Sequence, residues 1–314
     1  MAGSEKLRIL SLLPSATEIL CRLGLEKNIV GISHECDFPL NLSHLPKVTR
    51  PKLDPNQRGK KIHEDLKALI REGLSIYDVD LDLLESLAPN LIVTQDQCHV
   101  CAVSKEDLER SLSHLTKVKP QICTLTPHTL DDIHRDFLKI GVVTNREQAA
   151  QDLITEFWIK LNSINSKVGT ELSTHPKVLC LEWLEPLMVA GGWIPEIVKL
   201  AGGVPLIISK PEKFREVLWS EIENSNPDIV VIFPCGYPIS KTLDEIKSST
   251  ELKKLSTFRA FKEEKVFICD GNQFFNRPGP RITDSCEILA GLFHPQKFKE
   301  NSNEVSKLND SIFN

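Results

Sequence analysis

Residues 84–94 read LESLAPNLIVT, and this stretch decides the fold. Its first half has the spacing of a helix end, a Pro-Asn dipeptide then forms a turn, and the apolar second half is typical of a buried strand. The same order of features returns at residues 222–232, which read IENSNPDIVVI. A polar loop with a cysteine follows each stretch, and these cysteines are Cys98 and Cys235. The chain therefore repeats one structural unit.

A second pair of similar segments precedes these two. Residues 8–12 read RILSL and residues 177–181 read KVLCL, and both open a unit in which strands and helices alternate. Such alternation implies parallel sheets with helices on their faces. Residues 145–166 have the longest helical pattern, and some 22 residues would form a rod of roughly 33 Å. We predict an α/β protein with two Rossmann-like αβ lobes, parallel sheets and one long connecting helix.

The expected boundaries follow from this pattern. The prediction is an N-terminal αβ lobe at 1–128, connecting helices at 129–170, a C-terminal αβ lobe at 171–297 and a frayed polar tail at 298–314. Within the lobes we also expect Ser15 to cap the first helix, residues 40–60 to form a loop and residues 242–248 to form a helix. Ligands of parallel sheets sit outside the carboxyl ends of the strands, so we expect function in a cleft between the two lobes.

Composition excludes several classes of protein. The 314 residues are 41% hydrophobic and 26% charged, with a net charge of -5. No basic stripe favours nucleic acid, and no apolar run approaches the roughly 20 residues of a membrane span. Residues 1–8 have no apolar signal region, so we expect a cytosolic protein. Nine cysteines in such a protein favour reduced thiols over a disulfide framework.

Position divides the cysteines into two groups. Five lie inside apolar helices or strands and are expected in the core: Cys21, Cys123, Cys180, Cys269 and Cys286. The other four follow strand ends, where the cleft is expected: Cys36, Cys98, Cys101 and Cys235.

The loop cysteines leave three interpretations open. Zinc or iron could be held by soft ligands, namely His34, Cys36, Cys98, His99 and Cys101. The Cys-x-x-Cys pair could instead act as a redox dithiol or supply a nucleophile. The third interpretation is that reduced thiols simply line a pocket.

The second lobe supplies most of the candidate ligand contacts. Trp183 and Trp193 stand at the expected cleft edge and suit a flat, amphipathic ligand, with Tyr237 following the strand near them. Residues 270–281 read DGNQFFNRPGPR and form a polar loop stiffened by two prolines. Within it, Arg277 and Arg281 could bind a carboxylate or phosphate. The alternative for each of these residues is a structural role in core cover or a salt bridge.

Six ordered segments now carry a family resemblance. They read SLLPSATE (11–18), SHECDFP (33–39), VTRP (48–51), TQDQCHVCAVS (94–104), LEWLEPL (181–187) and DGNQFFNRPGPR (270–281). They are similar to segments of cobalamin-type substrate-binding proteins of ABC transporters, over residues 7 to 297. The resemblance implies the helical-backbone class of periplasmic binding proteins, with two αβ lobes joined by one long helix and ligand between them. Transporter docking is not expected without export.

Our first hypothesis is a cytosolic binding protein for a small-molecule ligand, which is cobalamin-like, another metal chelate or otherwise planar. The predicted ligand contacts are Ser15, Thr17, Glu182, Trp183, Trp193, Cys235, Tyr237, Asn272, Phe275, Arg277 and Arg281. The alternative is a metal- or thiol-dependent enzyme that acts on a small molecule in the same cleft, through the histidine and cysteines named above.

Overall fold

Two equivalent turns show the repeat at atomic scale. Asn90 Oδ1 accepts a hydrogen bond from the backbone N–H of Arg8 at 2.8 Å. Asp228 Oδ2 accepts one from the backbone N–H of Lys177 at 2.7 Å. In each case the side chain of the Asx residue after the proline accepts a hydrogen bond from a residue at the start of a strand: Arg8 directly precedes β1 (Ile9–Ser11), and Lys177 begins β7 (Lys177–Leu184). The two similar segments of sequence therefore form the same local structure.

The structure is a computed structural model that describes residues 6–71, 76–96, 105–112, 119–169, 175–210, 214–298, 304–309 and 312. The chain divides into two compact units. Unit 1 comprises Met1–Gln57, Glu64–Pro127 and Asp131–Thr155, and unit 2 comprises Arg58–His63, His128–Leu130 and Glu156–Asn314.

The helices and strands up to the long helix alternate as the sequence predicts. They are β1 (Ile9–Ser11), α1 (Pro14–Arg22), β2 (Ile29–Ile32), β3 (Thr49–Pro51), α2 (Gly59–Arg71), β4 (Tyr77–Val79), α3 (Leu81–Leu87), β5 (Leu91–Gln95), α4 (Lys105–Leu112), β6 (Gln121–Leu125), α5 (Leu130–Val143) and α6 (Glu147–Val168). Strands β2, β1, β5 and β6 form a parallel sheet in that order. Strands β3 and β4 pair separately and antiparallel.

The remaining helices and strands build the sheet of unit 2. They are β7 (Lys177–Leu184), β8 (Leu187–Val189), α7 (Ile194–Leu200), β9 (Val204–Pro205), β10 (Arg215–Glu216), α8 (Trp219–Ser225), β11 (Ile229–Ile232), α9 (Ile239–Ser248), α10 (Arg259–Lys262), β12 (Val266–Cys269), α11 (Ile282–Phe293) and β13 (Val305–Lys307). The strand order is β10-β8-β7-β11-β12-β13, and β9 also pairs with β7.

The inner strands of this second sheet repeat the first sheet. Val178 of β7 pairs with Ile229 of β11 as Ile9 of β1 pairs with Leu91 of β5, and both pairings are parallel. The outer strands pair antiparallel with their neighbours: β8 with β7, β10 with β8 and β13 with β12. This differs from the expected all-parallel sheet. Strand β8 returns from β7 through a two-residue connection, and only antiparallel strands can be joined so tightly.

Each unit has its own hydrophobic core. The core of unit 1 includes Leu10, Leu84 and Ile92, all fully buried. The core of unit 2 includes Ile232 and Leu308, also fully buried. Burial of this kind is the dominant favourable term in folding, so each unit has its own source of stability.

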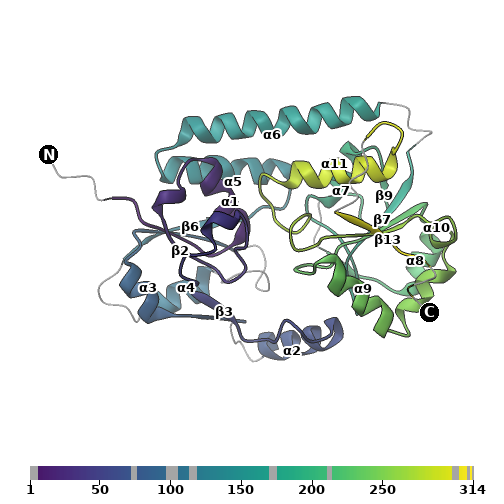
Figure 1. The fold of residues 1–314 in the computed structure, drawn as a ribbon, viewed down its shortest axis with the longest axis horizontal. Helices are drawn as coiled ribbons and strands as arrows, with labels where there is room; N and C mark the ends of the chain where they lie inside the picture. The colour runs from purple at the N-terminus through teal and green to yellow at the C-terminus, as the bar shows by residue number, and fades with distance from the viewer. Residues whose placement is uncertain are drawn as a thin grey trace. The chain divides into compact units, whose positions relative to one another are not determined.

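Helix α6 is the long helix that the sequence predicts (Figure 1). It runs for 22 residues, and the division between the two units falls within it, after Thr155. Within the described residues, no helix combines the length and the apolar character that crossing a membrane requires.

Three local expectations were wrong. Helix α1 begins at Pro14 with Leu13 as its N-cap, so Ser15 does not cap it; proline is suited to the first helical position because it lacks an N–H. Residues 40–60 are not all loop, because β3 and the start of α2 lie there. The tail is not wholly frayed either, because β13 pairs with β12.

Candidate functional site

A buried hydroxyl and thiol cluster lies at the carboxyl end of β1 in unit 1. Thr17 Oγ1 lies 2.8 Å from Ser11 Oγ and 3.1 Å from Cys36 Sγ. Thr17, Ser15 and Cys36 are 0%, 2% and 3% exposed. The hydroxyl of Thr17 is thus engaged inside the unit, and ligand contacts for Ser15 and Thr17 stay predictions.

His34 follows β2 and has an internal partner. Its Nδ1 lies 2.8 Å from Thr49 Oγ1, and its ring lies 5.3 Å from that of Tyr77. Burial lowers the pKa of His34 to about 4, and the charge of Lys47 adds to this effect. The imidazole is therefore neutral at pH 7.

The predicted metal site is only partly described. Cys98, His99 and Cys101 lie outside the described residues. Within the residues that are described, no group of three or more His, Cys, Asp or Glu side chains is arranged to hold a metal ion. The zinc or iron prediction, which includes His34 and Cys36, therefore stays a prediction.

An aromatic face forms in unit 2 where β7 and β11 end side by side. We use this name for Trp183 and Tyr237, whose ring centroids are 5.2 Å apart at 59°. Trp183 is half-buried and its Nε1 donates to the carbonyl of Glu185 at 3.1 Å. Lys241 Nζ lies 3.8 Å from the centroid of the Tyr237 ring, which places a cation on the ring face.

The Tyr237 hydroxyl has an unusual environment. Tyr237 is only 5% exposed, and within the described residues its oxygen has no hydrogen-bond partner. Burial raises the pKa of its phenol, and the nearby Glu245 and Cys235 add to the effect. The group therefore keeps its proton and is a hydrogen-bond donor.

Gly59 and Glu245 complete the surroundings of the aromatic face. The Gly59 N–H donates to Glu245 Oε1 at 2.8 Å. A Cβ at Gly59 would lie 3.4 Å from both Trp183 Cζ2 and Tyr237 Oη, so even the smallest side chain here would contact both of these residues. Burial raises the pKa of Glu245, although the Gly59 N–H acts in the opposite direction.

Cys235 and Glu182 lie beside the aromatic face in sequence. Both are half-buried, and the backbone N–H of Cys235 donates to the carbonyl of Glu182 at 3.1 Å. This bond connects the loop after β11 to the end of β7. The arrangement brings both predicted residues together with Trp183 and Tyr237.

The polar loop 270–281 is held mainly by its own bonds. Arg277 is 6% exposed and its Nη2 donates to Asn272 Oδ1 at 3.0 Å. Trp193 Nε1 donates to the carbonyl of Phe275 at 2.8 Å, and Phe275 is fully buried. Arg281 is half-buried, with its guanidinium 5.5 Å from the ring centroid of Phe274. These contacts fit the structural alternative, and ligand binding by the five predicted residues stays a prediction.

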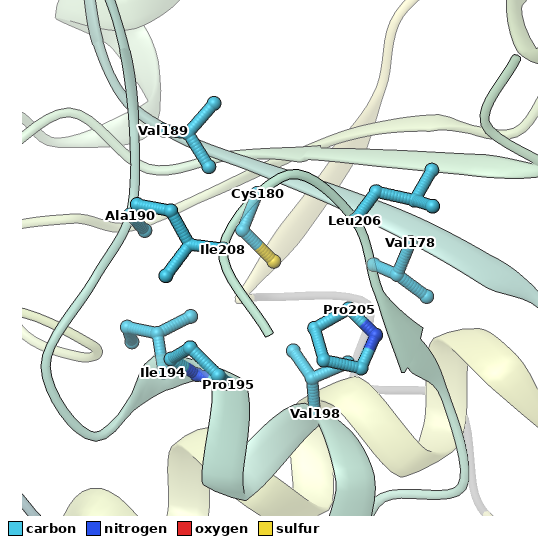
Figure 2. A pocket seen from close by; sticks show the side chains of 10 residues that line it. All are labelled: Val178, Cys180, Val189, Ala190, Ile194, Pro195, Val198, Pro205, Leu206 and Ile208. Atoms are coloured by element: carbon cyan, nitrogen blue, oxygen red, sulfur yellow. The ribbon is translucent and has the colours of Figure 1, made fainter. Parts of the chain in front are cut away.

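A small apolar cavity of about 10 Å³ lies elsewhere in unit 2. Figure 2 shows the Cys180 sulfur among apolar side chains that include Val178, Ile194 and Ile208. A small-molecule site needs roughly 300–1,000 Å³. This cavity is therefore part of the core.

The core cysteines have weakly acidic thiols. Cys123, Cys180, Cys269 and Cys286 are buried, as predicted, and Cys21 is half-buried. Burial raises the pKa of Cys21 to about 12 and that of Cys123 to about 11, and it raises those of the other three as well. These thiols therefore stay protonated at neutral pH.

Comparison with known proteins identifies the family. A family model described as periplasmic binding protein matches residues 9–272. The chain belongs to this family. It is a binding protein for a small ligand, and no comparison supports the enzyme alternative.

Two curated relatives of the chain are distant in sequence. The chain is 22% identical over 309 residues to an uncharacterized ABC transporter substrate-binding lipoprotein, YvrC, of Bacillus subtilis, covering 94% of this chain and 82% of that one. It is also 22% identical to a vitamin B12-binding protein of Photorhabdus laumondii, over 90% of this chain and 86% of the relative.

A solved structure of a periplasmic heme binding protein from Pseudomonas aeruginosa has the same fold. Its TM-score is 0.69 at 16% identity, over 96% of this chain and 97% of that one. At this identity the likeness shows the fold alone. It agrees with the periplasmic binding protein fold that the sequence resemblance implied.

Sequence reasoning missed three residues around the aromatic face. Lys241 and Glu245 lie on α9, and Gly59 begins α2. The first two lie in or beside a helix predicted at 242–248, but nothing in their spacing points to Tyr237. Gly59 lies at the end of a segment predicted as loop, and no local pattern connects it with Glu245.

Proposed function

We propose that the chain binds a tetrapyrrole, either a corrinoid such as cobalamin or a haem, with its flat ring against the aromatic face. The pairing of Trp183 with Tyr237 is the observation that carries this proposal. Aromatic side chains provide large, rigid contact surfaces for flat ligands. The named ligands of the Photorhabdus relative and the Pseudomonas structure support the same class of molecule.

The polar groups around the aromatic face suit a flat ligand that has hydrogen-bond acceptors on its edge. The Tyr237 hydroxyl is a donor, and Lys241 supplies a cation on the same ring. Acceptor groups at the edge of a ring, such as the amides of a corrin or the carboxylates of a haem, match these two partners. Trp183 then contacts the apolar ring while Tyr237 and Lys241 orient its rim.

Titration tests the proposal. Cyanocobalamin, dicyanocobinamide and haemin are titrated into purified protein, followed by absorbance and calorimetry. We expect saturable one-to-one binding of at least one of them. Trp183→Ala should weaken it by about 2 kcal/mol, or roughly 30-fold, because a central aromatic contact is lost.

The control is Trp158→Phe, a substitution on α6 that leaves the aromatic face untouched. It should bind like the wild type. Lack of binding of all three compounds at high micromolar concentration would reject the tetrapyrrole class. Equal binding by wild type and a folded Trp183→Ala variant would remove the aromatic face from the site.

A cytosolic location is part of the proposal. The seven described cysteines are all free thiols, which supports a reducing compartment. Fractionation of cells that make the untagged protein tests it. Recovery in an extracytosolic fraction would contradict this location, and it would also contradict the expectation that the protein does not dock on a transporter.

A further inference from the structure

The first turn of α2 lies over the aromatic face. Residues 58–63 group with unit 2, whereas the rest of the helix groups with unit 1. Gly59 is buried, its N–H bonds Glu245, and a Cβ at this position would contact both Trp183 and Tyr237. We call residues 58–63 the cover.

The cover is only partly buried. Gly59 is its one buried residue; Arg58, Lys60 and Lys61 are exposed. A segment with little buried apolar surface belongs to the low-stability end of a structure. The bond between Gly59 and Glu245 holds the one buried residue of this turn in place.

The hydroxyl under the cover lacks a partner. Tyr237 is nine-tenths buried, and among the described residues nothing accepts a hydrogen bond from its oxygen. Buried polar groups in folded proteins almost always find a partner, so an orphaned donor calls for an explanation. Gly59 brings its backbone close to this oxygen without offering it an acceptor.

We propose that the cover is displaced when ligand binds, and that the Tyr237 hydroxyl beneath it then donates to an acceptor on the rim of a flat ligand. This deepens the proposed function and rests on it. The ligand replaces the Gly59 backbone on Trp183 and supplies the acceptor that the cover lacks. The affinity measured for the wild type is then the intrinsic affinity multiplied by the fraction of molecules in which the cover is open.

The first experiment releases the cover without ligand. Glu245→Ala removes the acceptor, and Gly59→Pro removes the donor at a helix position where proline is tolerated. Asp244→Ala, an exposed carboxylate on the same helix, is the matched control. Hydrogen exchange of residues 58–63 and acrylamide quenching of Trp183 fluorescence report opening, and near-ultraviolet circular dichroism reports folding.

Both release variants should exchange at least about fivefold faster in the cover than the control and expose Trp183 to quencher. They should also bind cyanocobalamin or haemin at least about fivefold more tightly than the wild type. Adding Tyr237→Phe to Glu245→Ala should then weaken binding by about tenfold, because the ligand loses its donor.

The second probe separates this proposal from the proposed function. Anilinonaphthalene sulfonate is an aromatic dye with a sulfonate acceptor group. If no tetrapyrrole binds any variant, the proposed function fails, and the dye still decides the role of the cover. Binding of the dye to both release variants but not to the control, reduced by Tyr237→Phe, supports a displaceable cover. Equal dye binding by control and release variants, or unchanged exchange in residues 58–63, overturns it.

Discussion

Asp136 is a buried carboxyl group on α5 that is 6% exposed. Within the described residues its Oδ2 has no hydrogen-bond partner. Burial raises its pKa to about 7 from the ordinary 3.8, although the charge of Lys139 and a hydrogen bond from the Thr126 backbone lower it. The folded protein therefore keeps a proton on this group over a range of pH in which the unfolded chain has lost it.

This difference gives a pH-dependent stability. The pKa of Asp136 is raised in the folded protein. Its contribution to the free energy of unfolding is therefore most favourable below pH 3.8 and is lost as pH rises to about 7. Asp136→Asn removes the titration, so at pH 8 the variant should exceed the wild type in free energy of unfolding, by ~4 kcal/mol at most. Urea denaturation at several pH values measures this.

The control for this prediction is Asp131→Asn, the same change at an exposed position of the same helix. It should follow the wild type across the whole pH range. If the difference between Asp136→Asn and the wild type is the same at pH 4 and pH 8, the buried carboxyl group does not control this pH dependence.

Single residues also explain why the repeat could be read from the sequence. Ala88 and Asn226 both end a helix in the left-handed conformation, with φ of 42° and 43°. The proline that follows each and the Asx residue after it then fix the turn into the strand. All these signals are local, so they are visible in sequence without any knowledge of tertiary contacts.

Among elements, strongly periodic ones were predicted best. The long helix was expected at 145–166 and runs over Glu147–Val168, with Leu153, Phe157 and Leu161 buried as one stripe. It starts later than expected because Asn145 has a φ of 54° and cannot be part of the helix. Periodicity identifies the element, whereas backbone geometry decides its end.

Short strands were missed because their sequences have no periodicity of their own. Strands β3 and β4 have three residues each and β9 and β10 have two, too few for alternation to be recognised. Strand β13 lies in a tail whose composition is polar, yet its residues pair with Phe267, Ile268 and Cys269 of β12. Pairing partners that are distant in sequence decide such strands.

The tail contributes to the core of unit 2 through Leu308. This residue follows β13, is fully buried, and packs with the core that includes Ile268. Leu308→Ala should lower the free energy of unfolding by about 2–5 kcal/mol, because the substitution leaves a cavity where the buried end of the leucine side chain was packed. Lys307→Ala, at an exposed neighbour, should cost about 0.5 kcal/mol or less. Similar values for the two variants in urea denaturation would mean that the tail is not packed as described.

For the whole molecule, Trp183 and Tyr237 were both predicted as ligand contacts, and their role stays a prediction. The structure brings them together because β7 and β11 are neighbours. The contact between Gly59 and Glu245 spans 186 residues, and no periodicity or turn signal encodes such a distance. The family resemblance could not supply it either, because none of the six similar segments contains either residue.

The two separate cores lead to a last prediction. Leu84 belongs to the core of unit 1 and Ile232 to that of unit 2, and both are fully buried. Leu84→Ala should destabilise unit 1 by about 2–5 kcal/mol, and Ile232→Ala should do the same for unit 2. If each core stabilises its own unit, native-state hydrogen exchange should accelerate mainly in the unit that carries the substitution.

Helix α6 is the critical region for this test, because the boundary between the units falls after Thr155 within it. Amides before Thr155 should respond to Leu84→Ala and those after it to Ile232→Ala, since each part of the helix packs with its own unit. If either substitution accelerates exchange equally in both sheets and along the whole helix, the chain opens as one cooperative body. The helix would then transmit stability between the units as well as joining them.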